Sequence, residues 1–519
     1  MNNQIKDVLV VGGGTSGWIM AARLAKQLGA NNDDNINVTL VESPDIAGIG
    51  VGEGTFPTMR ETLRSLGIPE TEFIRRCNAT FKQGIRFDHW EYSAQDKPGN
   101  HYYHLFNTPH TGSDLSLTDY WLLGMGDKSK SFADNLSNQA PICEAGLAPK
   151  KITTPEYKGT VNYAYHLDAK DFVEFLKEWS IEKLGVKHLL GNVEQVNNQP
   201  DGSIKSVITK EQGDICADLF IDCSGFRSLL LGQHLKVPFI DKSDVLFVDH
   251  AIAIQVPYSN DQAPIACTTI STAQEAGWTW DIGLNTRRGI GYVYSSKHTS
   301  HERAEQVLRD YVGEEAEGLP TNKFSMKVGY REEFWHKNCI GVGFSAGFLE
   351  PLESTALVMV EAAANLLCDQ FPRLKDDMPM VQKRFNKSFQ YRWERIIDFV
   401  KLHYYISKRD DSQFWIDNRD PATVPQSLLD KLAYWRHQAP MVYDFENIYE
   451  TFTLDSYQWI LYGMNYQTDI SLASPSYRRQ KEAAKEFERV QLATQASLDQ
   501  LPNHRDLLNK VFQYGLPKV

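Results

Sequence analysis

Several features that would direct this chain to other classes of protein are absent from its sequence. The 519 residues hold 54 Lys and Arg against 66 Asp and Glu, and no basic block could neutralise a phosphate backbone. Apolar stretches stay shorter than a bilayer span, and the opening MNNQIKDVLVVGGG lacks the charged and then apolar pattern of a signal peptide. We therefore expect neither nucleic acid nor a membrane as a partner.

Cysteine is also scarce: the seven residues are scattered, odd in number and without a CxxC pair. This pattern predicts reduced thiols and a cytoplasmic location. His298 and His301 could share one helix face, but no third ligand is near, so we expect them at the surface and predict no metal site. The length predicts either two domains or one elaborated domain of enzyme size.

A glycine-rich turn dominates the start of the chain. Residues 6–30, KDVLVVGGGTSGWIMAARLAKQLGA, run from an apolar β-branched stretch through this turn into residues with helical spacing. Within it Gly12, Gly14 and Gly17 form GxGxxG, which permits a tight turn, close approach to a pyrophosphate and close helix packing. The following helix start, with Thr15 and Ser16, would then face the phosphates.

The next strand, INVTLVE, ends at Glu42, where a carboxylate can bind ribose hydroxyls. The alternative is a surface charge at a strand end. The spacing favours the first interpretation, and the sequence therefore predicts an adenine dinucleotide.

Later segments favour FAD over NAD. Alternating glycines in residues 48–54 present backbone to a flat ring, and ADLFIDCSGFRS is a buried strand that stops at Gly225. Residues 339–367 run strand, glycine turn, loop, helix. Three segments converging on one cofactor predict FAD in a flavin-monooxygenase type of fold. Beyond the first turn and Glu42, the residues we assign to the cofactor are Gly50, Val51, Gly52, Glu53, Gly225, Phe348 and Leu349.

The predicted fold class is mixed α/β, with the GxGxxG βαβ unit and a mostly helical cap over the substrate. Residues 161–185 predict a short strand and an amphipathic helix, and Pro200, Asp201 and Gly202 predict a turn between strands. From about residue 380 the periodicity becomes helical. We therefore expect a core over 1–378, with a substrate-contacting insertion at about 95–160, and a cap over 379–519.

Collinear motifs spread over almost the whole chain resemble those of flavin-dependent halogenases of the tryptophan halogenase family. The matching stretches are GGGTSGWIMAARLA, GIGVGEGTFPTMR, NATFKQGIRF, YYHLF, YAYHLDAKDF, DLFIDCSGF, GWTWDIGL, GFLEPLESTAL and DFVKLHYY. The resemblance implies that FADH2, oxygen and a halide generate hypohalous acid, which crosses a tunnel to a lysine. It also implies a separate NAD(P)H-dependent flavin reductase, a small aromatic substrate and chloride or bromide as the halide. A homodimer is a further expectation.

The resemblance assigns catalytic roles to Lys82 and Glu353. The lysine amine would hydrogen-bond hypohalous acid or become a haloamine, and the second route needs an unprotonated nitrogen. The carboxylate would stabilise the cationic ring intermediate and accept its proton. Locally, a solvated lysine and a helix-start glutamate are the alternatives, and Glu350 is a competing carboxylate.

Further residues follow from the same resemblance. Backbone N–H groups of Thr355 and Ala356 would hold the halide, although a glycine is frequent in the family at the second position. His104 and Phe106 would line the aromatic substrate pocket, with Ser354 beside Glu353; a core aromatic cluster is the alternative.

The pair Trp278 and Trp280, followed by Ile282, matches the family fingerprint WxWxIP, except that Gly283 replaces the proline. Strand alternation puts both indoles on one face, where they can wall off a channel or simply fill a core. Gly283 is expected to loosen the backbone.

Two other functions stay open at this point. A single-component flavin hydroxylase would share the nucleotide loop but needs neither Lys82 nor the tryptophan pair. A non-catalytic flavin-binding protein is the third interpretation, which the presence of Lys82 and Glu353 disfavours. As a halogenase, the chain would act on an electron-rich aromatic, an indole or a tryptophan-like compound. Free indole is preferred, because residues 443–467 do not align securely with the free-tryptophan enzymes.

Overall fold

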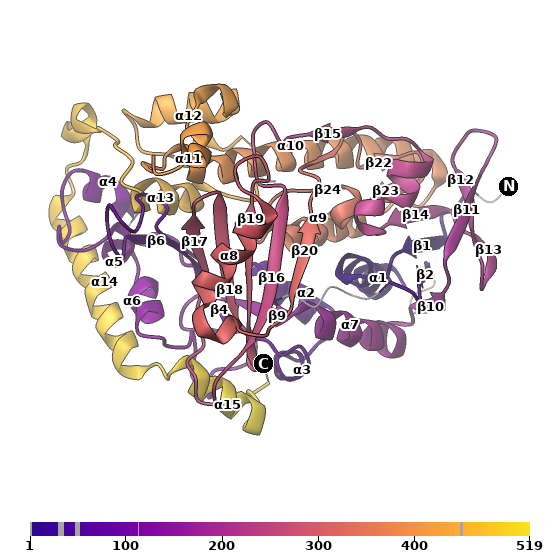
Figure 1. Ribbon diagram of the computed structural model, residues 1–519, viewed down its shortest axis with the longest axis horizontal. Coiled ribbons are helices and arrows are strands. Elements are labelled where there is room, and N and C mark those ends of the chain that lie inside the picture. Colours follow the sequence, from indigo (N-terminus) through magenta and orange to yellow (C-terminus); the bar gives the residue numbers. More distant parts are fainter. Residues whose placement is uncertain (1–2, 30–35, 47–51, 113, 447–449, 519) are drawn as a thin grey trace. The chain divides into compact units, whose positions relative to one another are not determined.

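The computed structural model describes residues 3–29, 36–46, 52–112, 114–446 and 450–518, and the chain divides into two compact units (Figure 1). Each unit is assembled from three separate stretches of sequence. The first unit comprises Met1–Asn78, Leu167–Ser243 and Met326–Trp393. The second comprises Ala79–His166, Asp244–Ser325 and Glu394–Val519.

A six-stranded sheet forms the centre of the first unit, in the order β10-β2-β1-β14-β23-β22. Its strands are β1 (Asp7–Val11), β2 (Asn37–Glu42), β10 (Lys187–Leu190), β14 (Leu219–Asp222), β22 (Trp335–His336) and β23 (Cys339–Gly341). All neighbours pair in parallel except β22 with β23. The apolar runs of β1 and β14 suit a parallel sheet, whose central strands are buried on both faces.

Helices pack beside this sheet: α1 (Thr15–Leu28) contacts both α7 (Ala169–Leu184) and α9 (Thr355–Asp369). The α7 helix begins where the Asp168 side chain accepts hydrogen bonds from the Lys170 and Asp171 N–H groups, and it ends at Gly185 in the left-handed region. The strand and helix predicted for residues 161–185 are thus confirmed. The unit also contains α2 (Thr58–Ser65), α3 (Glu70–Arg76), β3 (Gly52–Gly54), β11 (Val193–Asn198), β12 (Ile204–Thr209), β13 (Gly213–Cys216), β15 (Phe239–Asp241), β21 (Gly329–Arg331) and β24 (Gly347–Phe348).

A seven-stranded sheet forms the centre of the second unit, in the order β20-β16-β19-β18-β17-β5-β6, with only β17 and β5 parallel. Its strands are β5 (Gly84–Asp88), β6 (His101–Leu105), β16 (His250–Pro257), β17 (Thr269–Gln274), β18 (Gly277–Gly283), β19 (Arg287–Tyr294) and β20 (Thr321–Ser325). Separately, β4 (Thr80–Lys82) pairs antiparallel with β9 (Ala164–Asp168), and β7 (Thr111–Gly112) with β8 (Leu115–Ser116).

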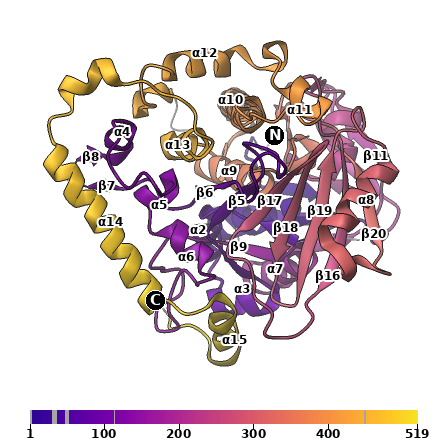
Figure 2. The same ribbon diagram turned by 60° about the vertical axis from the view of Figure 1, so that its left-hand side comes forward.

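The long helix α10 (Met378–Tyr405) starts in the first unit and finishes in the second. The other helices of the second unit are α4 (Leu117–Leu122), α5 (Phe132–Leu136), α6 (Gln139–Glu144), α8 (His301–Val312), α11 (Gln413–Asn418), α12 (Gln426–Trp435), α13 (Leu454–Gly463), α14 (Gln480–Gln500) and α15 (His504–Tyr514). Figure 2 shows α14 lying along α4, α5 and α6. The helical character predicted from about residue 380 is confirmed, whereas the domain boundary at 379 stays a prediction. Among the described residues, no helix is long and apolar enough to cross a bilayer.

Candidate active site

The first glycine turn has the geometry that its three glycines predict. A Cβ on Gly12, whose φ is +118°, would collide with the carbonyl oxygen of Cys223, and one on Gly17 would collide with the carbonyl oxygen of Gly12. Beside Gly14, by contrast, no described atom lies within 4 Å of the position a Cβ would take. The turn therefore leaves space beside the N-terminus of α1, the kind of position at which helices bind anions.

Two of the separated segments assigned to the cofactor, those around Cys223 and Gly343, contact the first glycine turn in the first unit. Gly12 lies against Cys223, and a Cβ on Gly343 would collide with the Ser16 hydroxyl. Since β1, β14 and β23 are parallel neighbours, their carboxyl ends share one edge of the sheet, which is where open α/β sheets bind ligands. Around this edge lie Thr15 and Ser16 at the start of α1 and Gly225 just after β14.

Gly52, Glu53, Phe348 and Leu349, which were also assigned to the cofactor, belong to the first unit. The Phe348 ring centroid lies 4.8 Å from that of Phe344, and Leu349 is buried. Gly52 and Glu53 form part of β3, and burial raises the pKa of Glu53 to about 7. Gly50 and Val51 lie outside the described residues.

Glu42 ends β2, and its carboxylate is fixed rather than solvated. Its Oε1 lies 2.7 Å from Nε2 of His188 and 3.5 Å from Nζ of Lys177. A Cβ on Gly13 would collide with the other oxygen, Oε2. The carboxylate is therefore held against the glycine turn, and its role in binding ribose stays a prediction.

Glu353 lies in the loop between β24 and α9, two residues before that helix begins, and it is 1% exposed. Glu350 in the same loop is equally buried. Ser354 takes a left-handed backbone with φ of 55°, and its N–H donates to the carbonyl oxygen of Pro351 at 3.0 Å. Helix α9 then begins at Thr355, so the N–H groups of Thr355 and Ala356 lie at the positive end of its dipole.

Lys82 ends β4 in the second unit, and its side chain is fully buried. Its Nζ lies 5.5 Å from the centroid of the Phe106 ring, so the structure brings these two predicted residues together. His104 belongs to β6 and lies between aromatic side chains that sequence reasoning did not connect to it. The ring centroid of Phe399 is 5.6 Å away and that of Phe452 is 6.0 Å away.

Hydrogen bonds on both sides of Lys82 fix the strand that carries it. The Thr80 hydroxyl donates to the carbonyl oxygen of Gly283 at 2.6 Å, and the Phe81 N–H donates to Nε2 of His504 at 3.2 Å. The Gln83 N–H donates to the carbonyl oxygen of Cys267 at 2.7 Å. Partners this distant in sequence left no local signal, and sequence reasoning missed them.

The tryptophan pair lies on β18 as predicted. Ring centroids of Trp278 and Trp280 are 6.4 Å apart, and Trp278 is buried, as is Ile282. A Cβ on Gly283 would lie 2.9 Å from Cγ2 of Ile265 and 3.1 Å from the Tyr258 hydroxyl. A side chain at this strand end would therefore be crowded, and the Gly283 carbonyl accepts a hydrogen bond from Thr80. That Gly283 loosens the backbone stays a prediction.

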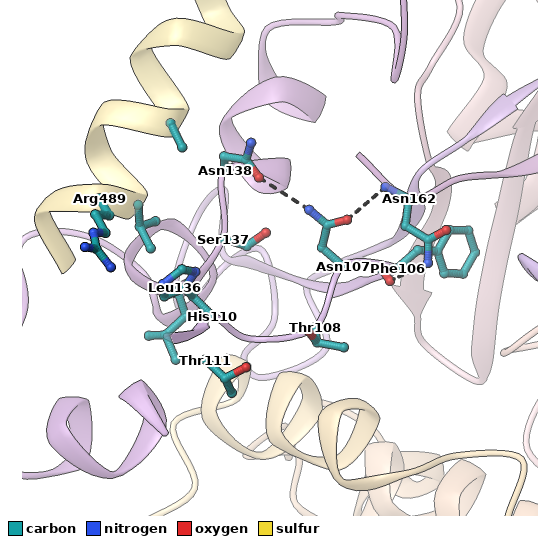
Figure 3. Close-up of a pocket in the computed structure, with 12 residues that line it drawn as sticks. Phe106, Asn107, Thr108, His110, Thr111, Leu136, Ser137, Asn138, Asn162 and Arg489 are labelled. Carbon is teal, nitrogen blue, oxygen red and sulfur yellow. Dashed lines mark hydrogen bonds between the residues drawn. The ribbon is translucent and has the colours of Figure 1, made fainter. Parts of the chain in front are cut away.

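A cavity of about 460 Å³ opens within the second unit (Figure 3). Phe106 is among its lining residues, and Asn107 forms hydrogen bonds to Asn138 and to the backbone N–H of Asn162. The remaining lining residues are Thr108, His110, Thr111, Leu136, Ser137, Arg489, Val490 and Ala493. They come from distant segments, which is why no sequence motif indicated them.

His298 differs from expectation. Its side chain is only 5% exposed because the ring packs against Phe247 and Phe414. Its Nε2 lies 3.1 Å from Oδ2 of Asp417. Within the described ranges, no group of three His, Cys, Asp or Glu residues is arranged to hold a metal ion.

Comparison with known proteins decides the family. Residues 7–475 match the family described as tryptophan halogenase. The chain belongs to the tryptophan halogenase family. This result confirms the predicted family and the mixed α/β fold. It also confirms the prediction that the protein is an enzyme, a flavin-dependent halogenase. Flavin is the cofactor that this family implies.

Individual relatives cover nearly the whole chain. A crystal structure of a tryptophan halogenase from Shewanella frigidimarina has 44% identity and a TM-score of 0.96, with 100% of both chains covered. The tryptophan 6-halogenase SttH of Streptomyces toxytricini is 36% identical over 97% of this chain and 98% of its own. The tryptophan 7-halogenase RebH of Lentzea aerocolonigenes is 36% identical, and the match covers 81% of this chain and 80% of RebH.

Proposed function

We propose that this enzyme halogenates the indole ring of tryptophan or a close analogue, with hypohalous acid delivered through Lys82. The observation that carries the proposal is the complete burial of Lys82 on a strand fixed along its length, with its Nζ above the ring of Phe106. A surface lysine would have no such placement. The names of the relatives move the preferred substrate from free indole to tryptophan.

Bound as FADH2, the flavin supplies hypohalous acid from oxygen and halide. The glycine turn, Glu42 and the edge formed by β1, β14 and β23 would hold this cofactor. Lys82 would then position the acid by a hydrogen bond or accept the halogen on a neutral nitrogen, and both roles require an amine shielded from water.

Glu353 would act as the base that removes the ring proton after the halogen has added. A carboxylate that is 1% exposed also stabilises a cationic intermediate strongly, because little water screens its charge. The halide would be held by the N–H groups of Thr355 and Ala356 at the start of α9, since a helix N-terminus attracts anions.

The proposal also names a partner protein, the halide and the residues that surround the substrate. A separate NAD(P)H-dependent flavin reductase supplies FADH2, chloride or bromide is the halide, and residues 379–519 cover the substrate. His104 and Phe106 would stack on the indole, with Ser354 beside Glu353, and Trp278, Trp280 and Ile282 would line the channel. The enzyme would be cytoplasmic and would form a homodimer.

The experiment is product identification by mass spectrometry after incubation with FAD, a flavin reductase, NADH and oxygen. Tryptophan, indole and a phenol are each offered with chloride or bromide. We expect the halogen isotope pattern on tryptophan. If the product is hydroxylated tryptophan, the protein is a flavin hydroxylase and not a halogenase. If flavin-loaded protein gives no product at all, it is a non-catalytic flavin-binding protein.

A further inference from the structure

One buried histidine shares a sheet face with Lys82 and has no role in the function described above. In the β4–β9 pair Thr80 lies opposite His166, Phe81 opposite Tyr165, and Lys82 opposite Ala164. The Phe81 and Tyr165 rings, 6.3 Å apart, mark one face of the pair. Because side chains alternate along strands, Lys82 and His166 occupy the opposite face as diagonal neighbours, a spacing within reach of long side chains.

A contact with β17 holds the His166 ring in place. It is fully buried, and its Nε2 lies 2.8 Å from the hydroxyl oxygen of Thr269, the first residue of β17. Its Nδ1 is also buried and has no hydrogen-bond partner among the described residues. A buried ring nitrogen left in this state is unusual, because nearly all buried polar groups are paired.

Burial lowers the pKa of His166 well below its usual value, and the charge of Lys82, together with that of His504 when His504 is protonated, lowers it further. The groups that act on the ring from neighbouring elements are thus Lys82 on β4 and His504 on α15, with the uncharged Thr269 on β17. The imidazole is therefore neutral and carries one N–H. With that hydrogen on Nε2, donated to Thr269, Nδ1 presents a lone pair.

We propose that His166 is a positioning residue for Lys82, with its Nδ1 accepting a hydrogen bond from the Lys82 amine during turnover. The inference rests on the proposed role of Lys82. A neutral acceptor orients the amine without adding the negative charge by which a carboxylate would keep it protonated. One N–H of Lys82 is then directed at His166, and the rest of the nitrogen is available to hypohalous acid.

Two substitutions separate the ring nitrogens. H166N places an amide oxygen near the position of Nδ1 and gives up the contact with Thr269, whereas H166Q keeps a polar atom near Nε2 and gives up Nδ1. We expect H166Q to lower kcat about 100-fold, as a misplaced reacting group does, and H166N to stay within about 5-fold of the parent. T269V removes the Nε2 partner alone and should resemble H166N.

A readout independent of turnover is the titration of Lys82, followed by NMR of protein labelled with 15Nζ-lysine and assigned with K82M. Loss of an acceptor disfavours the ammonium form, so H166Q should titrate at lower pH than the parent. Flavin binding and thermal melting check that each variant is folded.

The outcomes are distinguishable. Loss of activity in H166Q but not H166N, together with the shifted titration, supports the inference. Equal activities of H166Q and H166N, with an unchanged titration, would overturn it while leaving the role of Lys82 intact if K82M is inactive. Halogenation by K82M would overturn the role of Lys82 and the inference together.

Discussion

Glu353 and Glu350 are two buried carboxylates of a single loop, and they provide a test at the scale of the residue. Each is 1% exposed, so substitution by glutamine changes charge with little change in volume. E353Q should lower kcat by at least about 100-fold, because the ring proton loses its acceptor. E350Q, as the matched control, should retain turnover, with flavin affinity measured for both. A larger loss in E350Q than in E353Q would transfer the role of base to Glu350.

Gly283 provides a second residue-scale test, of crowding at the end of β18. G283A should lower the free energy of unfolding by about 1–3 kcal/mol, because its Cβ would press on Ile265 and Tyr258. Urea unfolding measures the loss. In a double-mutant cycle, I265A should relieve part of it, because the Cγ2 atom nearest the new methyl is removed. Strict additivity of the two substitutions would show that crowding is not the reason for the glycine.

At the scale of the element, two glycines of the turn between β1 and α1 should have different roles, one in binding FAD and the other in the stability of the apoprotein. G14A adds a methyl in open space beside the helix N-terminus, so the apoprotein should unfold with an unchanged free energy while Kd for FAD rises at least about 10-fold. G17A should instead destabilise the apoprotein by about 1–3 kcal/mol, because its methyl meets the Gly12 carbonyl. Calorimetry and urea unfolding give both quantities. FAD affinity that survives in G14A would argue against this turn as the cofactor cradle.

Elements of this kind were predictable from sequence because their signals are local. The apolar run of β1, the glycines after it and the helical spacing of α1 lie within one stretch of chain, as do β9 and α7. The surroundings of His104 and Lys82 were not predictable. His104 contacts Phe399 and Phe452, and Phe81 beside Lys82 bonds to His504, so the partners are separated by hundreds of residues.

The stability of the whole molecule should depend on pH through its buried imidazoles. Burial lowers the pKa of His504 from 6.5 to about 4, and its neutral ring accepts from the Phe81 N–H. A lowered folded-state pKa contributes stability that is present above pH 6.5 and is lost as the pH falls toward 4. Between pH 7 and pH 5 this residue should account for about 2 kcal/mol of the decrease in unfolding free energy.

H504Q is the matched variant, because its amide keeps an acceptor near Nε2 for the Phe81 N–H and does not titrate, although it gives up the contact of Nδ1 with the carbonyl oxygen of Ile265. Urea unfolding at pH 7 and pH 5 should give a smaller decrease for H504Q than for the parent. Identical decreases would show that His504 is not a source of acid sensitivity.

Lys82 and Lys150 allow the most direct test of how the molecule works, because both are fully buried lysines of the second unit. The Lys150 Nζ donates to the carbonyl oxygen of Pro155 at 3.0 Å and lies 5.9 Å from the centroid of the Phe81 ring, which marks the face of the β4–β9 pair opposite to Lys82. The measurement is the mass spectrum of tryptophan after turnover with FADH2, oxygen and halide by K82M and K150M, each with its bound flavin quantified. We predict a halogen isotope pattern with K150M and unmodified tryptophan with K82M at equal flavin content. Halogenated tryptophan from K82M would contradict delivery through this lysine.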